Sequence, residues 1–94
     1  MSAQIPPFND THSFGMRLAA ARKARGFSQT HLAALVGVSL PRYHAWERDN
    51  STPNNIAIYR ELCRQLDVTV DWLFFGDTKA LSPETAEKLT RALG

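Results

Sequence analysis

The sequence predicts an all-α fold, in which five helices form a bundle and a short sixth helix follows at the C-terminus. Apolar residues recur at helical spacing in successive segments, and a residue that can cap a helix precedes most of these segments. Glycines and other turn-forming residues separate them. With 94 residues, 44% of them hydrophobic, the chain can form one compact domain with a modest core.

The first helix is expected from about Ser13 to Arg25, and Gly26 ends it. Its apolar face consists of Phe14, Leu18 and Ala21. Basic residues predicted to lie outside that face are Arg17, Lys23 and Arg25. Residues 1–12 contain two prolines and show no helical period, so we expect a flexible arm there.

Two short helices joined by a tight turn are predicted within residues 28–48. Ser28 can cap the first, because its hydroxyl can accept a hydrogen bond from a backbone N–H two or three residues later. Gly37 suits the left-handed conformation that ends a helix, and Ser39 can cap the second helix. The turn is therefore about three residues long, which is typical of a helix-turn-helix unit, whose second helix can enter a DNA groove.

The second of these helices has its buried face fixed by two rings, Tyr43 and Trp46, which are three residues apart and dominate the available apolar area. The opposite face and its flanks then form the candidate binding surface. Its six residues are Leu40, Pro41, Arg42, His44, Ala45 and Arg48.

Three further helices follow. The fourth is expected to begin after Asn54 or Asn55 and to reach Leu66. Thr69 can cap a short fifth helix over residues 70–75, which Gly76 closes. Ser82, Pro83 and Glu84 are typical of a helix start, and the apolar side of the sixth helix consists of Ala86, Leu89 and Leu93.

Four ordered segments give the chain a family resemblance: FGMRLAAARKARGFSQTHLA, VGVS, WERDNSTP and LDVTVDWLFFGD. Over about Phe14 to Phe75 it resembles the Cro and phage-repressor (C1) type helix-turn-helix proteins, known from many xenobiotic-response-element-like members. The resemblance implies a lambda-repressor-like five-helix bundle that binds double-stranded DNA. The expected domains are the arm at 1–12, a DNA-binding domain at 13–76, and a C-terminal helix at 77–94 that serves dimerisation or packing.

The chain departs from the family pattern in two places. Asp49 stands where family members usually carry glycine, and Asp tolerates a left-handed backbone. At the positions that match the family's base-reading residues stand Leu40, Pro41 and Ala45, none of which has a side-chain hydrogen-bonding group. Bidentate pairing with bases is therefore not available from these three residues.

The resemblance also implies individual roles. Gln29 matches a residue that bonds a DNA phosphate and braces the residues of the third helix. Asn50, Ser51 and Thr52 match a loop along the sugar-phosphate backbone. Arg22 and Glu47 match a structural ion pair between the first and third helices. Within the third helix Arg42 and His44 can donate to a base or phosphate, and Arg48 to a phosphate. Leu40 and Ala45 can meet thymine methyl groups, and Pro41 can offer only shape.

Charge is distributed unevenly along the chain. Residues 13–48 contain six basic residues and one acidic residue, whereas residues 49–94 contain five basic and seven acidic ones. A basic half favours a nucleic-acid partner. Because no run of 18 apolar residues and no secretion signal is seen, we expect a cytoplasmic protein without a membrane partner.

Catalytic and metal-binding patterns are missing from the sequence. There are no paired carboxylates, no nucleophile beside a base and no glycine-rich phosphate loop. The three histidines lack metal-ligand spacing, and the single cysteine, Cys63, falls in an apolar helical stripe. We therefore expect neither an enzyme nor a cofactor.

Four consecutive large apolar residues, 72–75, cannot all be buried by one short helix. Family members commonly dimerise through this region, which implies a homodimer through Trp72, Phe74 and Phe75, with Leu89 and Leu93 as further candidates. The alternative is that the sixth helix folds back over this patch.

The sequence thus predicts a sequence-specific DNA-binding transcriptional regulator. The favoured form is a bacterial or phage repressor that binds a pseudo-palindromic operator as a homodimer. One alternative is a protein-interaction module that keeps the fold and docks a partner through residues 40–41 or 72–75. Another alternative is the antitoxin of a toxin–antitoxin pair.

Overall fold

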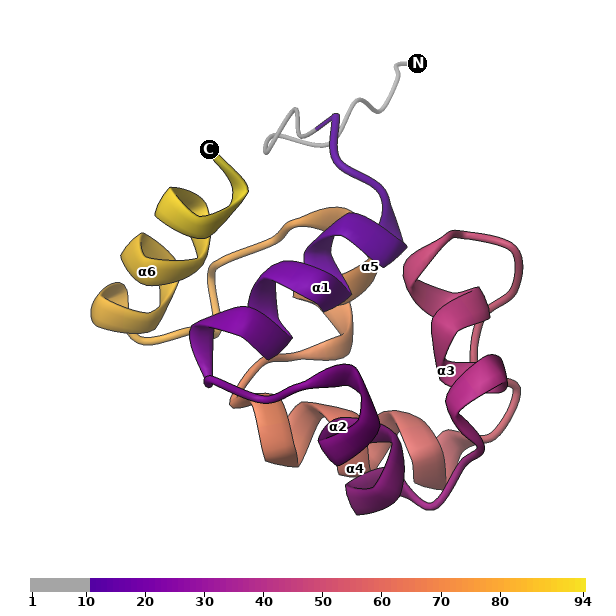
Figure 1. Cartoon of the computed structure of the whole chain (residues 1–94). Coiled ribbons are helices and arrows are strands. Elements are labelled where there is room, and N and C mark those ends of the chain that lie inside the picture. The colour runs from indigo at the N-terminus through magenta and orange to yellow at the C-terminus, as the bar shows by residue number, and fades with distance from the viewer. Residues whose placement is uncertain (1–10) are drawn as a thin grey trace, which may run out of the picture.

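The computed structural model describes residues 11–94, which form six α-helices and no strand (Figure 1). The helices are α1 (Phe14–Ala24), α2 (Gln29–Val36), α3 (Leu40–Glu47), α4 (Ile56–Leu66), α5 (Val70–Phe75) and α6 (Pro83–Leu93). The predicted all-α fold and the order of the helices are confirmed. Residues 1–10 of the expected N-terminal arm lie outside the described residues.

Each helix begins at a side-chain cap that accepts a backbone N–H from two or three residues later. The caps are Ser13, Ser28, Ser39, Asn55, Thr69 and Ser82. Asn55, rather than Asn54, is therefore the cap of α4. Gly37 and Gly76 end α2 and α5 in the left-handed conformation, as expected, because a residue without Cβ adopts it at little cost.

The hydrophobic core lies between α1 and the other helices. Its most completely buried side chains are Trp46, Tyr43, Leu18, Leu32, Leu62, Leu73 and Leu89. The predicted apolar face of α1 is buried, and Cys63 packs against the core from the edge. None of the described helices is both long and apolar enough to span a bilayer.

Arg17 corrects the expectation that it lies away from the apolar face of α1. Its side chain is buried, and its Nε and Nη2 atoms donate to the carbonyl oxygens of Leu73 and Phe74, both at 2.8 Å. These carbonyls belong to the last turn of α5. The last carbonyl groups of a helix have no N–H partner within the helix, and the helix dipole is negative at that end. The guanidinium therefore fastens α5 to α1.

Helix α6 packs against α1 on the side away from α3, so that α1 lies between them (Figure 1). Trp72 and Leu89 are each only 2% exposed within the single chain. The expectation that these two side chains lie between two copies is therefore corrected: the chain's own helices cover them. Phe75, by contrast, is 57% exposed.

Candidate nucleic-acid interface

The turn between α2 and α3 spans residues 37–39 and is held by local bonds. Gly37 has φ 78°, and the Val38 N–H donates to the Ala33 carbonyl at 3.0 Å. The Ser39 hydroxyl accepts the N–H of Arg42. These bonds fix the direction in which α3 leaves α2, and they place α3 at the edge of the molecule (Figure 1).

Helix α3 is anchored by its two rings. Tyr43 and Trp46 are at most 1% exposed, and their rings pack edge to face with centroids 5.6 Å apart. The six candidate residues of α3 all remain accessible. Pro41, Arg42 and Arg48 are exposed, whereas Leu40, His44 and Ala45 are partly exposed. The structure thus leaves this face open, and its role in binding stays a prediction.

Glu47 joins three elements through its carboxylate. Arg22 of α1 donates from Nε at 2.7 Å, Gln29 of α2 donates from Nε2 at 2.9 Å, and the Tyr43 hydroxyl donates within α3. The expected ion pair between Arg22 and Glu47 is therefore present. The bond from Gln29 agrees with the bracing of the third helix that the family resemblance implies. The bond from Tyr43, four residues before Glu47 on the same helix, was not predicted.

The pKa values of this cluster follow from burial and from these bonds. Burial raises the pKa of the Glu47 carboxyl, but the hydrogen bonds from Arg22, Tyr43 and Gln29 outweigh it, and the pKa ends below its ordinary value. Burial, then the bond to Glu47, raises the pKa of Tyr43. The bond to Glu47 raises the pKa of Arg22. At neutral pH the pair is therefore charged and Tyr43 keeps its proton.

Gln29 lies in the first turn of α2, where the sequence predicted a phosphate contact. Its amide nitrogen carries two N–H groups, one of which donates to Glu47. The other N–H remains for an anion at this helix N-terminus, where the dipole also favours negative charge. The bond to Glu47 fixes the orientation of the amide relative to α3.

Arg42 and the loop after α3 lie on the other side of that helix. The Nη2 atom of Arg42 donates to the Oδ1 atom of Asn54 at 3.2 Å. The Asn50 N–H closes α3 by donating to the Ala45 carbonyl at 2.9 Å. Asn50 and Ser51 are exposed, so their side chains are accessible to a partner.

Asp49 adopts the left-handed conformation that the sequence allowed for it, with φ 61°. Its carboxylate also makes two hydrogen bonds to the start of α1, which the sequence did not predict. Oδ1 accepts the backbone N–H of Gly15 at 2.8 Å, and Oδ2 accepts the Ser13 hydroxyl at 2.6 Å. The carboxylate therefore binds the N-terminus of α1 and joins it to the end of α3.

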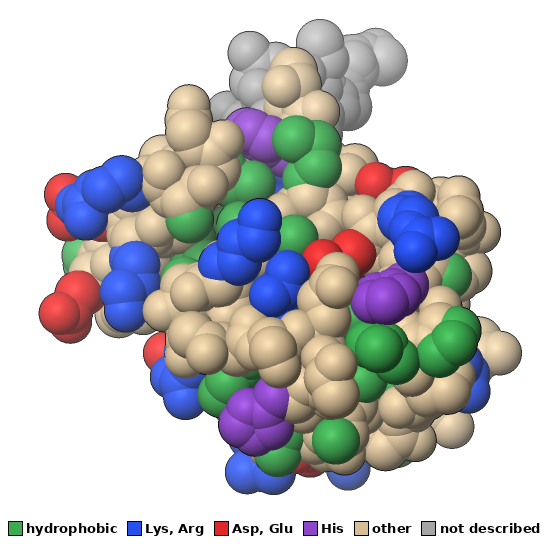
Figure 2. All heavy atoms as spheres, in the orientation of Figure 1, with side chains coloured by type: hydrophobic (Ala, Val, Ile, Leu, Met, Phe, Trp, Pro, Cys, Tyr) green, Lys and Arg blue, Asp and Glu red, His purple; other side chains and the backbone are tan. Residues whose placement is uncertain are grey.

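Positive charge on the surface is smaller than the sequence count suggests. Of the six basic residues within 13–48, Arg17 is buried and Arg22 is paired with Glu47. Those left exposed are Lys23, Arg25, Arg42 and Arg48. Over α3, at the right of the view, basic and histidine side chains lie beside hydrophobic ones, whereas acidic and basic side chains mix over α6 (Figure 2).

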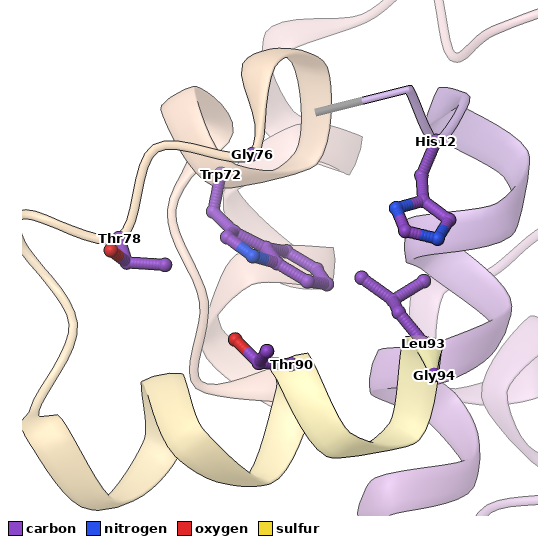
Figure 3. Close-up of a pocket in the computed structure, with 7 residues that line it drawn as sticks. All are labelled: His12, Trp72, Gly76, Thr78, Thr90, Leu93 and Gly94. Atoms are coloured by element: carbon purple, nitrogen blue, oxygen red, sulfur yellow. The ribbon is translucent and has the colours of Figure 1, made fainter. Parts of the chain in front are cut away.

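A cavity of about 410 Å³ lies at the junction of α5, α6 and the segment before α1. The Trp72 ring forms its middle, with Thr78 and Thr90 on one side and Leu93 and His12 on the other (Figure 3). Among the described residues that line it, His12 has the one titratable side chain, so these residues bring no acid–base pair together there. The cavity is separate from the exposed face of α3.

A family model described as helix-turn-helix matches residues 18–73, which is more than half of the chain. The match includes all of α2, α3 and α4 and the turns between them. No match was found among curated proteins or among solved structures.

Proposed function

Because the chain belongs to the Cro/C1-type helix-turn-helix family of DNA-binding transcription regulators, we propose that it is a cytoplasmic repressor that binds a pseudo-palindromic operator as a homodimer. The observation that carries the proposal is the open face of α3. Its rings are buried on one side, while Arg48 and Arg42 are exposed on the other side and flank. A helix held in this way can enter a major groove.

The residues around α3 have complementary parts in this proposal. Gln29, Arg48, Asn50 and Ser51 contact the sugar-phosphate backbone and set the register of the protein on the duplex. The α3 residues that enter the groove are Leu40, Pro41, Arg42, His44 and Ala45, of which Arg42 can donate to a base or to a phosphate. The bond from Gln29 to Glu47 supports this arrangement, because it holds a backbone-contacting amide in a fixed relation to α3.

The exposed end of α5 supports the proposed dimer. Phe75 is 57% exposed and lies beside the half-buried Phe74, with ring centroids 6.3 Å apart. A symmetric contact through this pair would bury apolar area that one copy leaves in water. Two α3 helices in such a dimer would lie about 34 Å apart, which is one turn of DNA.

A titration of the protein with a pool of random duplexes tests DNA binding directly. The logarithm of affinity should fall with the logarithm of salt concentration, with a slope of about −0.9 for each phosphate contacted. Arg48→Ala should weaken binding and reduce that slope. Arg91→Ala removes the same charge from α6, where Arg91 pairs with Glu87, and should change neither quantity.

The contrary results are also clear. The absence of salt-dependent binding to any duplex would rule out the proposal and favour a protein partner for the apolar part of α3. An Arg91→Ala variant that weakens binding as much as Arg48→Ala would show that net charge, rather than the α3 face, drives the interaction.

A further inference from the structure

The outward face of α3 has an apolar centre between two polar flanks. At 100° per residue, Pro41 and Arg48 lie opposite the midpoint of the buried rings, and Ala45 and His44 lie about 50° to either side of them. Arg42 and Leu40 lie about a quarter turn away, on opposite flanks. The first two turns therefore present Pro41 and Ala45, neither of which can hydrogen-bond through its side chain, with His44, which can, on the side toward Leu40.

On one flank, Arg42 is directed away from that centre. Its guanidinium donates to Asn54, at the start of the segment that leads into α4. The loop 50–52, proposed to follow the sugar-phosphate backbone, lies between α3 and this asparagine in the chain. When α3 occupies a groove, a flank faces a groove wall, and the walls consist of phosphates. The bond to Asn54 therefore places Arg42 at a wall rather than at the base edges.

The opposite flank of α3 also carries a polar group that can contact phosphates at the groove wall. The Gln29 amide is held there by Glu47, which follows Leu40 by seven residues on α3. Leu40 packs partly against the core and is thereby held in place. With both walls served by polar side chains, the base edges between them meet mainly Pro41 and Ala45, with His44 at the side.

The chemistry of the groove decides what such a centre can recognise. In the major groove, bases present hydrogen-bonding groups and one apolar group, the C5-methyl of thymine. A polar base edge covered by hydrocarbon loses its water without a new partner, which is unfavourable. A methyl group loses only unfavourable hydration and gains contact. The apolar centre therefore discriminates in favour of methyl-bearing pyrimidines.

We propose that Ala45 and the hydrocarbon ring of Pro41, for which the sequence predicted only a contribution of shape, read the C5-methyl groups of pyrimidines in each half-site, while Arg42 contacts the phosphate backbone. The inference rests on the proposed DNA-binding function and names the class of DNA that it selects. It also extends to modified DNA. Cytosine methylated at C5 presents the same methyl group at the same place in the major groove, so it can replace thymine at a contacted position.

The first test uses duplexes selected by the protein from a random library. In the best-bound duplex, each thymine is replaced in turn by uracil, which lacks the methyl group but keeps every hydrogen-bonding group. We expect affinity to fall about 3- to 10-fold at one or two positions in each half-site, as for the loss of one buried methyl, and to be unchanged elsewhere. A cytosine at those positions should bind more tightly when it is methylated at C5.

Two variants assign the effect to α3. Pro41 is exposed in the first turn of α3, so the Pro41→Ser variant should fold. It should reduce the loss of affinity that uracil causes at the thymine position contacted by residue 41. Arg42→Ala should weaken binding to all duplexes to a similar extent and reduce the salt slope by about 0.9, with base preferences unchanged. Arg91→Ala, on α6, serves as the control and should leave both preferences and slope unaltered.

Specific binding that is indifferent to uracil at every thymine, and to methylation of cytosine, would overturn the inference while leaving the proposed function intact. A changed base preference in Arg42→Ala would overturn the assignment of Arg42 to the backbone. A failure to bind any duplex would overturn the proposed function and this inference together.

Discussion

The carboxylate of Asp49, one residue beyond the C-cap of α3, accepts the backbone N–H of Gly15 in the first turn of α1 at 2.8 Å. This bond joins residues 34 positions apart in the chain. It depends on the absence of a side chain at Gly15. A Cβ atom there would lie 2.4 Å from the Glu47 carbonyl oxygen and 2.8 Å from Asp49 Oδ2. The close approach of α1 and α3 thus requires this glycine.

Gly15→Ala is therefore expected to destabilise the protein. The atom that the new methyl meets is a backbone oxygen, which cannot rotate away, so α1 and α3 must separate. Overpacking of this kind should lower the free energy of unfolding by about 3 kcal/mol, as measured by urea denaturation. Gly26→Ala is the control: its Cβ meets nothing within 4 Å, and only its φ of 75° opposes it, at about 1 kcal/mol. Equal denaturation midpoints for the two variants would contradict the steric explanation.

Asp49→Gly should separate two opposed effects. The change relieves the left-handed backbone at Asp49, which is worth about 1 kcal/mol, but it removes two hydrogen bonds to a charged acceptor. Because each such bond contributes about 1.5–3 kcal/mol, a net loss of at least about 2 kcal/mol is expected in urea denaturation. Asp49→Asn keeps an acceptor oxygen and should lose less. A more stable Asp49→Gly variant would show that the side chain contributes nothing net.

The residues that the sequence predicted well are those whose signals are local. A cap needs only an oxygen near the next turn, and a left-handed end needs only a residue such as Gly37 that tolerates it. The buried face of α3 was also predictable, because Tyr43 and Trp46 offer far more apolar area than their neighbours. Each of these predictions depends on a few adjacent residues.

The bonds that the sequence did not predict join distant elements. Arg17 falls between apolar residues of α1. Its hydrogen bonds to two carbonyl groups depend on where α5 packs, which the sequence of α1 does not indicate. The contact of Arg42 with Asn54 likewise depends on how the segment between α3 and α4 turns back toward α3. Polar side chains of this kind have partners chosen by tertiary packing, which residue spacing along one helix does not report.

Glu47→Gln should make stability less dependent on acid. The Glu47 pKa is lowered in the folded state, so the unfolded chain takes up the proton first, near pH 4.5. Its contribution is therefore complete above that pH and is lost as the pH falls through the lower, folded pKa. We expect Glu47→Gln to cost about 3 kcal/mol at pH 7, because it leaves Arg22 without its buried partner, and to cost less below pH 4.5.

The control for this experiment is Glu61→Gln. Its carboxyl pKa is also lowered, first by the bond from Arg64, but on α4 Arg64 is largely exposed and Glu61 partly exposed. Solvent screening should make its effect on urea denaturation small at every pH. A Glu47→Gln variant whose cost does not change between pH 7 and pH 4 would contradict the role given to the Glu47 charge.

Arg17→Met should weaken the attachment of α5 to α1. Methionine fills much of the same space but leaves the Leu73 and Phe74 carbonyls without the N–H groups that bind them. Unsatisfied buried groups cost about 1–3 kcal/mol each, so we expect the free energy of unfolding to fall by at least about 2 kcal/mol. The same change at the exposed Arg60 of α4 should alter it by less than about 0.5 kcal/mol. Similar losses in both variants would mean that the carbonyl bonds contribute little.

Phe75→Ser tests the proposed dimer without disturbing the core, because Trp72 and Leu73 remain buried on the other side of α5. Sedimentation equilibrium should show a dimer for the native chain and a monomer for the variant at micromolar concentration, since the apolar area that drives association is removed. A monomer can reach only one half-site at a time, so its affinity for a full selected site should fall at least tenfold, with half-site affinity unchanged. Leu35→Ser, at a partly exposed leucine of α2, should stay dimeric. If Phe75→Ser remains dimeric, the dimer contact lies elsewhere. If the native chain stays monomeric even when bound to a full operator site, the proposed dimer contact at the end of α5 is wrong.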